Sequence, residues 1–337
     1  MVFLQGCQLF GPKEIPNVSI TLAPVEVPGD LLSSGEEFET QLKALMLEKG
    51  YDLQNIELTV SKTHTDATQA VVDGTTDLAF LPILNYVGSK DTMTLFASTT
   101  HSRLDLGSED LSVYNTQSDA STQTSLLPYR YSLIYTGPSA MGQSLYSKFK
   151  NNEEITWIDL NSAKWCHVVV TSLDGYIYPS LWLIDHYERR MGELFDHSLE
   201  VKGYVDVMRS LADESCDVGV GPDTLRNTYA SQWTQSTENE GFGRSQDIYQ
   251  EVHVIGVSSK IYDNVFVTRL SKAEDEETLL TKEFTQALQD SLLSLANNSE
   301  SKLKFFSLLG FEGLTLVDPL EYDSVKPAYD YIQQIMN

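Results

Sequence analysis

Residues 56–81 read IELTVSKTHTDATQAVVDGTTDLAFL, and this stretch decides the fold class. Apolar residues alternate with polar ones over 56–60, which is typical of a strand with one buried face. A helical pattern follows and stops at Gly74, and residues 77–81 form an apolar run that indicates a fully buried strand. A strand, a helix and a strand joined by short turns predict part of a parallel α/β sheet.

The same alternation continues in both directions along the chain. Residues 18–23 predict another strand, and a helix is predicted between Ser33 and Gly50. Residues 201–221 repeat the order of strand, helix and strand, which indicates a second α/β unit. Between the two groups, the polar stretch 100–127 is predicted to form a long loop. The length of 337 residues is enough for two domains of this class.

The chain is strongly acidic. It has 23 Lys and Arg residues against 48 Asp and Glu residues, a formal net charge of −25. This charge repels phosphate groups, so we expect no nucleic-acid partner and no docking on a bare anionic membrane. The charges are scattered rather than clustered, so a highly soluble surface accounts for most of them. Hydrophobic residues make up 41% of the chain, which excludes wholesale disorder.

The N-terminal residues 1–16 are predicted to be a lipid-attachment segment and a tether. The sequence LQGC at 4–7 resembles the lipobox of bacterial lipoproteins, in which the Cys sulfur is lipid-modified after signal cleavage. Residues 1–4 would then be the remnant of the apolar signal region. The alternative is a free cysteine on a loose N-terminus. The lipobox predicts an extracytoplasmic protein that Cys7 anchors to the membrane of a bacterial cell.

The other two cysteines, Cys166 and Cys216, each border an apolar run, and we predict buried thiols at strand edges. No two cysteines have CxxC spacing and the six histidines are scattered, so we expect no metal site. Cys166 and His167 are adjacent on a predicted strand and point to opposite faces, which argues against a catalytic pair. No dinucleotide or phosphate-loop motif is present, so we expect no cofactor and no catalytic residue.

Residues 168–179 read VVVTSLDGYIYP and predict a strand at 168–170, a polar turn and a helix. The free N–H groups at the start of that helix can hold ligand oxygens, helped by the positive end of the helix dipole. Alternatively, Ser172 or Asp174 caps the helix by accepting hydrogen bonds from its first amides. The turn alone does not decide between these two interpretations.

Three blocks of the chain resemble the phosphate/phosphonate-binding family of ABC-importer substrate-binding proteins. They are AVVDGTTDLAF at 70–80, SLDGYIYP at 172–179 and SLADESCDVG at 210–219, with a fainter match over 258–269. Their order and spacing extend over residues 17–310. Each block alone is a weak signal, and together with the lipobox they are fairly specific.

The resemblance implies a two-lobed type II periplasmic-binding-protein fold of α/β class, in which two crossover strands form the hinge. Lobe one is then expected to consist of residues 17–130 plus 250–337, and lobe two of residues 131–249. The crossovers are expected near 129–131 and 252–256.

The ligand site that the resemblance implies differs from the family pattern. Family members use Ser, Thr and Ser at the lobe-two turn to hold the phosphonate oxyanion, and here these positions are Ser172, Leu173 and Asp174. A carboxylate there repels a phosphonate, so carrying over the family ligand conflicts with the residues. The expected ligand-binding residues are polar, aromatic and acidic, and they suit an organic ligand with a cationic or hydrogen-bond-donating group. They are His64, Leu81, Tyr129, Arg130, Tyr131, Ser172, Asp174, Gly175, Tyr176, Tyr204 and Asp223.

The function that follows is a lipid-anchored receptor of an ABC importer, which closes two lobes on a small polar organic ligand and delivers it to the permease subunits. Arg130 is expected to meet an anionic end of the ligand. Two alternatives stay open, a phosphonate or phosphate receptor as in the parent family and an enzyme on the same fold. Ligand recovered unchanged favours a receptor, and turnover favours an enzyme.

Overall fold

The structure of the protein is a computed structural model. It describes residues 11–26, 28–104, 110–116, 124–194, 197–270, 281–298 and 303–336. Cys7 and its lipobox lie outside these residues.

The chain divides into two units, one from Met1–His101 and Asp263–Asp323 and the other from Ser102–Tyr262 and Ser324–Asn337. The division differs from the predicted lobes, because residues 102–130, 250–262 and 324–337 belong to the second unit. The chain therefore passes from one unit to the other after His101, Tyr262 and Asp323, where we expected two crossovers at other residues. An amphipathic pattern shows that a helix has a buried face, but it does not show which core that face joins.

The first unit is built on a sheet with the strand order β16-β6-β15-β5-β2-β4. Its strands are β2 (Val18–Leu22), β4 (Ile56–Val60), β5 (Leu78–Leu81), β6 (Met93–Leu104), β15 (Val265–Arg269) and β16 (Gly313–Thr315), and β1 (Lys13–Ile15) pairs separately with β3 (Tyr51–Leu53). Strand β2 lies between β4 and β5 and is parallel to both, which confirms the parallel sheet predicted from the sequence. Strand β15 runs antiparallel between β5 and β6.

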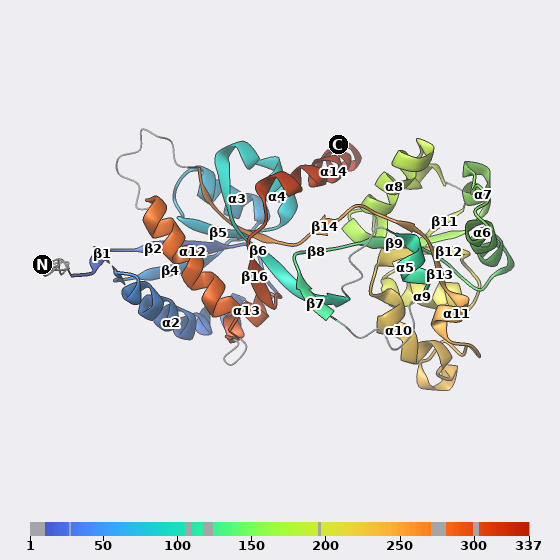
Figure 1. Cartoon of the computed structure of the whole chain (residues 1–337), viewed down its shortest axis with the longest axis horizontal. Coiled ribbons are helices and arrows are strands. Elements are labelled where there is room, and N and C mark those ends of the chain that lie inside the picture. The colour runs from blue at the N-terminus through green and yellow to red at the C-terminus, as the bar shows by residue number, and fades with distance from the viewer. Residues whose placement is uncertain are drawn as a thin grey trace, which may run out of the picture. The chain divides into compact units, whose positions relative to one another are not determined.

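Helices cover this sheet, as Figure 1 shows for α2 and α12. They are α1 (Pro28–Ser33), α2 (Gly35–Glu48), α3 (His64–Val72), α4 (Ile83–Gly88), α12 (Lys282–Ala296) and α13 (Lys304–Leu308), with the short turns η1 (Lys90–Thr92) and η5 (Pro319–Val325). Helix α3 begins as its sequence suggests, because the Thr63 hydroxyl accepts a hydrogen bond from the Asp66 amide at 3.0 Å. In the core, the rings of Phe38 and Phe305 stack with their centroids 4.4 Å apart.

The second unit has a five-stranded sheet with the order β11-β10-β12-β9-β13. Its strands are β9 (Ser132–Thr136), β10 (Trp165–His167), β11 (Ser198–Glu200), β12 (Val218–Pro222) and β13 (His253–Val257). Strands β10, β11 and β12 are parallel, and β9 runs antiparallel to both β12 and β13. A separate pair joins β8 (Tyr129–Arg130) to β14 (Ile261–Tyr262), and β7 (Thr124–Leu127) precedes it in the chain.

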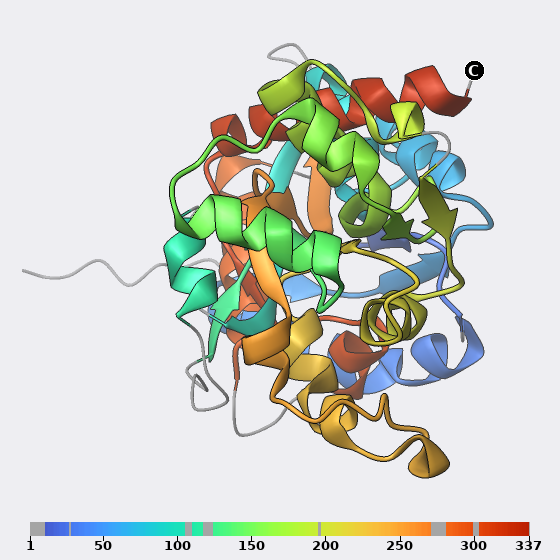
Figure 2. The ribbon, with the colours of Figure 1, turned by 90° about the vertical axis from the view of Figure 1, so that its right-hand side faces the viewer.

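Helices lie against this sheet, as the ribbons in Figures 1 and 2 show, and their buried side chains form two hydrophobic clusters with it. One contains residues of α6 (Ala140–Lys150), α7 (Trp157–Ser162), α8 (Tyr178–Tyr187), η3 (Met191–Glu193) and α14 (Lys326–Met336). The other contains residues of α5 (Leu111–Asn115), α9 (Tyr204–Ala212), α10 (Leu225–Thr234) and α11 (Ile248–Glu251), and η4 (Thr237–Asn239) follows α10. Along β9, Ile134 joins the first cluster and Leu133 and Tyr135 join the second, as the alternation of a strand requires.

Three local predictions were wrong. The valines at 168–170 follow β10 rather than forming a strand, and Val169 is 50% exposed. The stretch 100–127 contains the end of β6, helix α5 and strand β7 among its described residues, so it is not simply a loop. The predicted strand at 201–204 lies after β11, and Tyr204 begins α9. In each case the local composition misplaced the ends of an element whose register depends on its neighbours in the sheet.

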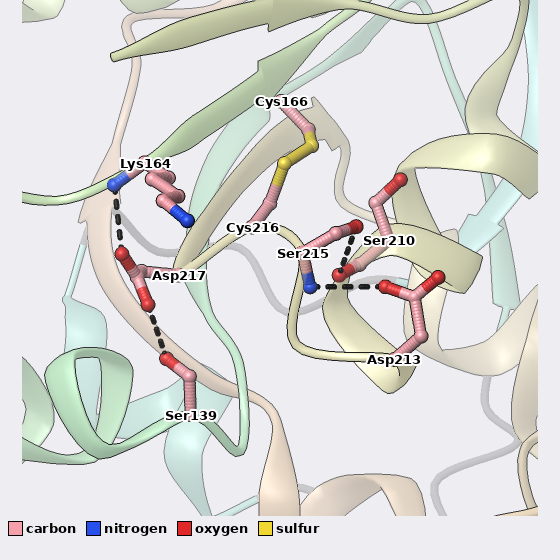
Figure 3. The surroundings of a disulfide bond; sticks show 8 residues. All are labelled: Ser139, Lys164, Cys166, Ser210, Asp213, Ser215, Cys216 and Asp217. Atoms are coloured by element: carbon pink, nitrogen blue, oxygen red, sulfur yellow. Dashed lines mark hydrogen bonds between the residues drawn. A yellow bond between two sulfur atoms is a disulfide. The ribbon is translucent and has the colours of Figure 1, made fainter.

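Cys166 and Cys216 form a disulfide, with their Cα atoms 5.9 Å apart (Figure 3). The prediction of buried thiols was therefore wrong about their bonding, although both residues are buried. Cys166 lies in β10 and Cys216 lies two residues before β12, and these two strands are neighbours in the sheet. Their sequence separation of 50 residues gives no sign of this proximity. In Figure 3 the Asp217 carboxylate beside the disulfide accepts hydrogen bonds from the Ser139 hydroxyl at 2.5 Å and the Lys164 amide at 2.7 Å.

In the described part of the chain, every helix is too short or too polar to span a membrane.

Candidate ligand site

The predicted turn after β10 begins a π-helical turn, η2 (Leu173–Ile177), that leads directly into α8. Ser172 is its N-cap, and its hydroxyl accepts a hydrogen bond from the Gly175 amide at 3.1 Å. Single π-helical turns occur frequently at functional sites. We considered that the first amides of this helix either hold ligand oxygens or are capped by Ser172 or Asp174. The hydrogen bond from the Gly175 amide shows that Ser172 acts as a cap.

Gly175 allows this turn to pack tightly. A Cβ atom at this position would lie 2.2 Å from the Val168 Cγ2 atom and 3.1 Å from the Ser172 Oγ atom. The hydroxyl of Tyr204 would lie at 3.3 Å. Any larger residue would displace these neighbours, so the glycine allows the turn to adopt this position, and its contact with a ligand stays a prediction.

Asp174 forms a bidentate ion pair with Arg130. The Arg130 Nε atom donates to Oδ1 at 2.5 Å, and the second guanidinium nitrogen donates to Oδ2 at 2.7 Å. The side chains are 22% exposed for Arg130 and 12% exposed for Asp174. The Asp174 carboxylate and the Arg130 guanidinium therefore neutralise each other, and the contact of Arg130 with an anionic end of the ligand stays a prediction. Parallel N–H···O bonds of this kind are among the strongest in proteins, so the two side chains hold each other in place.

Two hydroxyl groups lie beside this pair. The oxygens of Ser172 and Tyr204 are 3.1 Å apart and share a hydrogen bond. Burial raises the pKa of Tyr204 to about 12, and the negative charge of Asp174 adds to this effect. Tyr204 therefore stays protonated at neutral pH and is able to donate as well as accept a hydrogen bond.

Asp223 is a partly buried residue that directly follows β12. One of its oxygens, Oδ2, accepts a hydrogen bond from the Tyr131 amide at 3.2 Å. The other, Oδ1, has no hydrogen-bond partner among the residues that the structure describes, although it is inaccessible to solvent. Burial raises the pKa of Asp223 to about 6, while the charge of Arg103 opposes this shift. An unsatisfied buried acceptor is costly, and it is a natural partner for a donor group of a ligand.

The tyrosines near Arg130 pack against one another. The ring centroids of Tyr129 and Tyr131 are 5.8 Å apart, and the Lys260 ammonium lies 4.2 Å from the centroid of the Tyr129 ring. Tyr131 is buried, so its ring mainly contributes to packing. Lys260 already covers one aromatic face that we expected to be available to a ligand cation.

The structure thus brings together seven of the predicted residues within the second unit. They are Tyr129, Arg130, Tyr131, Ser172, Asp174, Tyr204 and Asp223, and Gly175 supports their turn. Tyr176, in contrast, is directed elsewhere, because its hydroxyl interacts with Tyr331 of α14 and its ring contacts His167. His64 and Leu81 belong to the first unit, where His64 is exposed and Leu81 is completely buried.

Sequence reasoning missed two serines that support the site. The Ser132 hydroxyl donates to the backbone oxygen of Asp174 at 2.5 Å, and the Ser132 amide donates to the Ser258 hydroxyl at 2.9 Å. Both side chains are buried; Ser132 fixes η2 to the sheet, and Ser258 holds Ser132. The polar Ser132 among the buried residues of β9 was the only available signal.

The cluster offers hydroxyl groups, one unsatisfied carboxylate oxygen and a charge-neutralised ion pair. This set is suited to hydrogen bonds with a polar ligand that carries donors. Two of the Arg130 guanidinium nitrogens already donate to Asp174.

Comparison with known proteins identifies the family. Residues 20–322 match the family model described as "ABC transporter, phosphonate, periplasmic substrate-binding protein". No curated protein sequence matches the chain.

Several solved structures are similar to this one. Mh-p37 of Mycoplasma hyorhinis, a candidate thiamine pyrophosphate transporter, has a TM-score of 0.61 at 12% identity, and the match covers 94% of this chain and 99% of that one. XAC2383 of Xanthomonas citri bound to ATP has a TM-score of 0.51 at 10% identity, with 96% and 98% covered. PhnD1 of Prochlorococcus marinus in complex with methylphosphonate has a TM-score of 0.46 at 11% identity, with 94% and 98% covered.

These findings confirm the α/β type II periplasmic-binding-protein fold. The family consists of extracytoplasmic substrate-binding components of transporters, which in general are not enzymes. Because the family model matches most of its length, the chain belongs to the phosphonate-type periplasmic substrate-binding proteins of ABC transporters.

Proposed function

We propose that this protein is a lipid-anchored receptor of an ABC importer whose ligand is a small polar organic molecule with hydrogen-bond donors. In this proposal a simple phosphonate is not the ligand. The observation that carries it is the bidentate pair of Arg130 and Asp174, which neutralises the cation nearest to the turn. The unsatisfied Oδ1 atom of Asp223 adds a second reason, because it needs a donor.

Two relatives support a ligand of this class. XAC2383 was solved with ATP, and Mh-p37 is a candidate thiamine pyrophosphate transporter. Both molecules carry an aromatic nitrogen heterocycle with an amino group, and both also carry phosphate groups, so they support the organic part of the proposal and not the exclusion of oxyanions. A similar fold therefore accommodates an organic ligand as large as ATP.

The binding test is isothermal titration calorimetry at neutral pH with methylphosphonate, inorganic phosphate and thiamine. We expect the two oxyanions to bind weakly or not at all. An Asp223→Asn variant replaces one acceptor oxygen by an amide donor. It should therefore lower the affinity for a donor-bearing ligand at least tenfold. Micromolar or tighter binding of methylphosphonate to the unmodified protein would contradict the proposal.

An extracytoplasmic location agrees with the Cys166–Cys216 disulfide, since stable disulfides form in oxidising compartments. Anchoring through Cys7 is a separate part of the proposal. More than one acyl chain is needed for stable membrane attachment, and the lipoprotein modification would supply them. We expect Cys7→Ser to release the protein from the membrane fraction and to abolish incorporation of labelled palmitate. Failure of the wild-type precursor to incorporate palmitate would refute the anchor while leaving the receptor function intact.

A further inference from the structure

The second unit contains a cavity of about 710 Å³ that borders the ligand cluster, because Ser258 lines it and accepts a hydrogen bond from the Ser132 amide. It lies along the edge strand β13, and residues at the start of α5, the end of α6 and along α8 line it. Its volume is within the usual range for sites that bind small molecules. Arg130, Asp174 and Asp223 are not among its lining residues, so a different set of side chains faces the cavity, although Tyr178 and Ser258 connect it to the ligand cluster.

Aromatic side chains form much of the lining. The Trp182 ring stacks on His186 with the centroids 4.6 Å apart and meets Tyr187 edge-on at 5.7 Å. Gly256 of β13 allows this arrangement, because a Cβ atom there would lie 2.8 Å from two carbons of the indole. The indole is therefore held against the strand, so its position is set before any ligand binds. Phe149 adds another half-buried aromatic ring.

The charges around the cavity are negative. The carboxylates of Glu153, Glu154 and Asp185 line it and are exposed, and no Lys or Arg is among its lining residues. The only lining side chain that can become positive is His186, whose Nδ1 atom is 2.8 Å from the Trp182 carbonyl oxygen. Burial raises the pKa of Tyr187, and the charge of Glu154 contributes to this shift, so the negative potential reaches the aromatic lining.

We propose that this cavity is a second binding site, which takes an organic cation with an apolar body. The half-buried ring of Tyr187 attracts a cation through its quadrupole. Trp182, which packs between His186 and β13, adds to the apolar lining that buries the body of the molecule. The three carboxylates favour a positive ligand and repel an anionic one. An anionic phosphonate is therefore excluded from this site for the same reason that a cation is attracted.

The probe is benzyltrimethylammonium, titrated by calorimetry and followed by the tryptophan fluorescence of the intact protein. Benzyl alcohol and phenylacetate serve as neutral and anionic probes of similar aromatic content. We expect binding in the order cation, neutral molecule, anion, and weaker cation binding as the salt concentration rises. The fluorescence response to the cation should be lost in Trp182→Phe.

The decisive variant is Glu154→Gln/Asp185→Asn, which keeps the shape of two exposed side chains and removes their charges. We expect this variant to lower the affinity for benzyltrimethylammonium at least fivefold and to leave the affinity for benzyl alcohol unchanged. The matched control is Glu36→Gln/Glu37→Gln, which removes the same charge from exposed positions of α2 in the first unit. This control should leave the affinities for both probes unchanged. Equal binding of the cation and benzyl alcohol, or equal effects of the two double variants, would overturn the proposal.

Discussion

Replacing Asp174 by Ser should convert the ligand cluster toward oxyanions. The substitution removes the carboxylate that now holds the Arg130 guanidinium at 2.5 and 2.7 Å. A released guanidinium can donate to a phosphonate, and one charge-assisted hydrogen bond contributes about 1.5–3 kcal/mol. This corresponds to about a tenfold to hundredfold gain in affinity for methylphosphonate. Adding Leu173→Thr supplies a further hydroxyl donor and should increase the gain.

The measurement is calorimetry with methylphosphonate on the wild-type protein, Asp174→Ser and the double variant. Asp206→Ser is the matched control, because Asp206 also pairs with an arginine of the same unit, Arg209, but at an exposed position on α9. The control should not acquire phosphonate affinity. Because Arg130 is only 22% exposed, losing its partner should also lower the free energy of unfolding by about 1–3 kcal/mol. An unchanged methylphosphonate affinity in a folded Asp174→Ser protein would refute the role assigned to the ion pair.

Three further predictions concern the second unit. Removing the disulfide by Cys166→Ala/Cys216→Ala, which opens a loop of 50 residues, should lower the free energy of unfolding by about 4 kcal/mol in urea titrations, and a loss below 1 kcal/mol would contradict this. Burial raises the folded-state pKa of Asp223 to about 6, so between pH 4 and 6 the folded protein holds a proton that the unfolded chain releases, and stability falls as pH rises through this window. Asp223→Asn should therefore flatten that pH dependence in thermal melts and stabilise the protein by about 2–3 kcal/mol at pH 7. Gly175→Ala should lower the free energy of unfolding by about 1–3 kcal/mol, because its Cβ atom would lie 2.2 Å from the Val168 side chain. An unchanged melting temperature would show that the turn adjusts freely.

The arrangement of the parallel strands was predictable because each is a short apolar run between turn residues. The strand at 56–60 and the one at 77–81 both appear in the structure, with β2 between them. The ends of elements were harder to predict. The valines at 168–170 have high strand propensity, yet the chain leaves the sheet before them to form the turn that carries Asp174.

The candidate site was predictable in composition but not in its pairing. Ser172, Asp174 and Tyr204 were identified from the sequence, and the structure brings them together. That Arg130, 44 residues before Asp174, neutralises this carboxylate depends on how β8 lies against η2, which no local pattern encodes. For the same reason the sequence did not show that Tyr176 turns toward Tyr331 of α14.

The identity of a molecule retained by the purified protein tests the central claim most directly. Native mass spectrometry of the protein isolated under gentle conditions, followed by release and fragmentation of the bound species, would identify it. We predict a small organic molecule with N–H or O–H donors, whose retention is lost in Asp223→Asn. A retained phosphonate or inorganic phosphate would contradict the account.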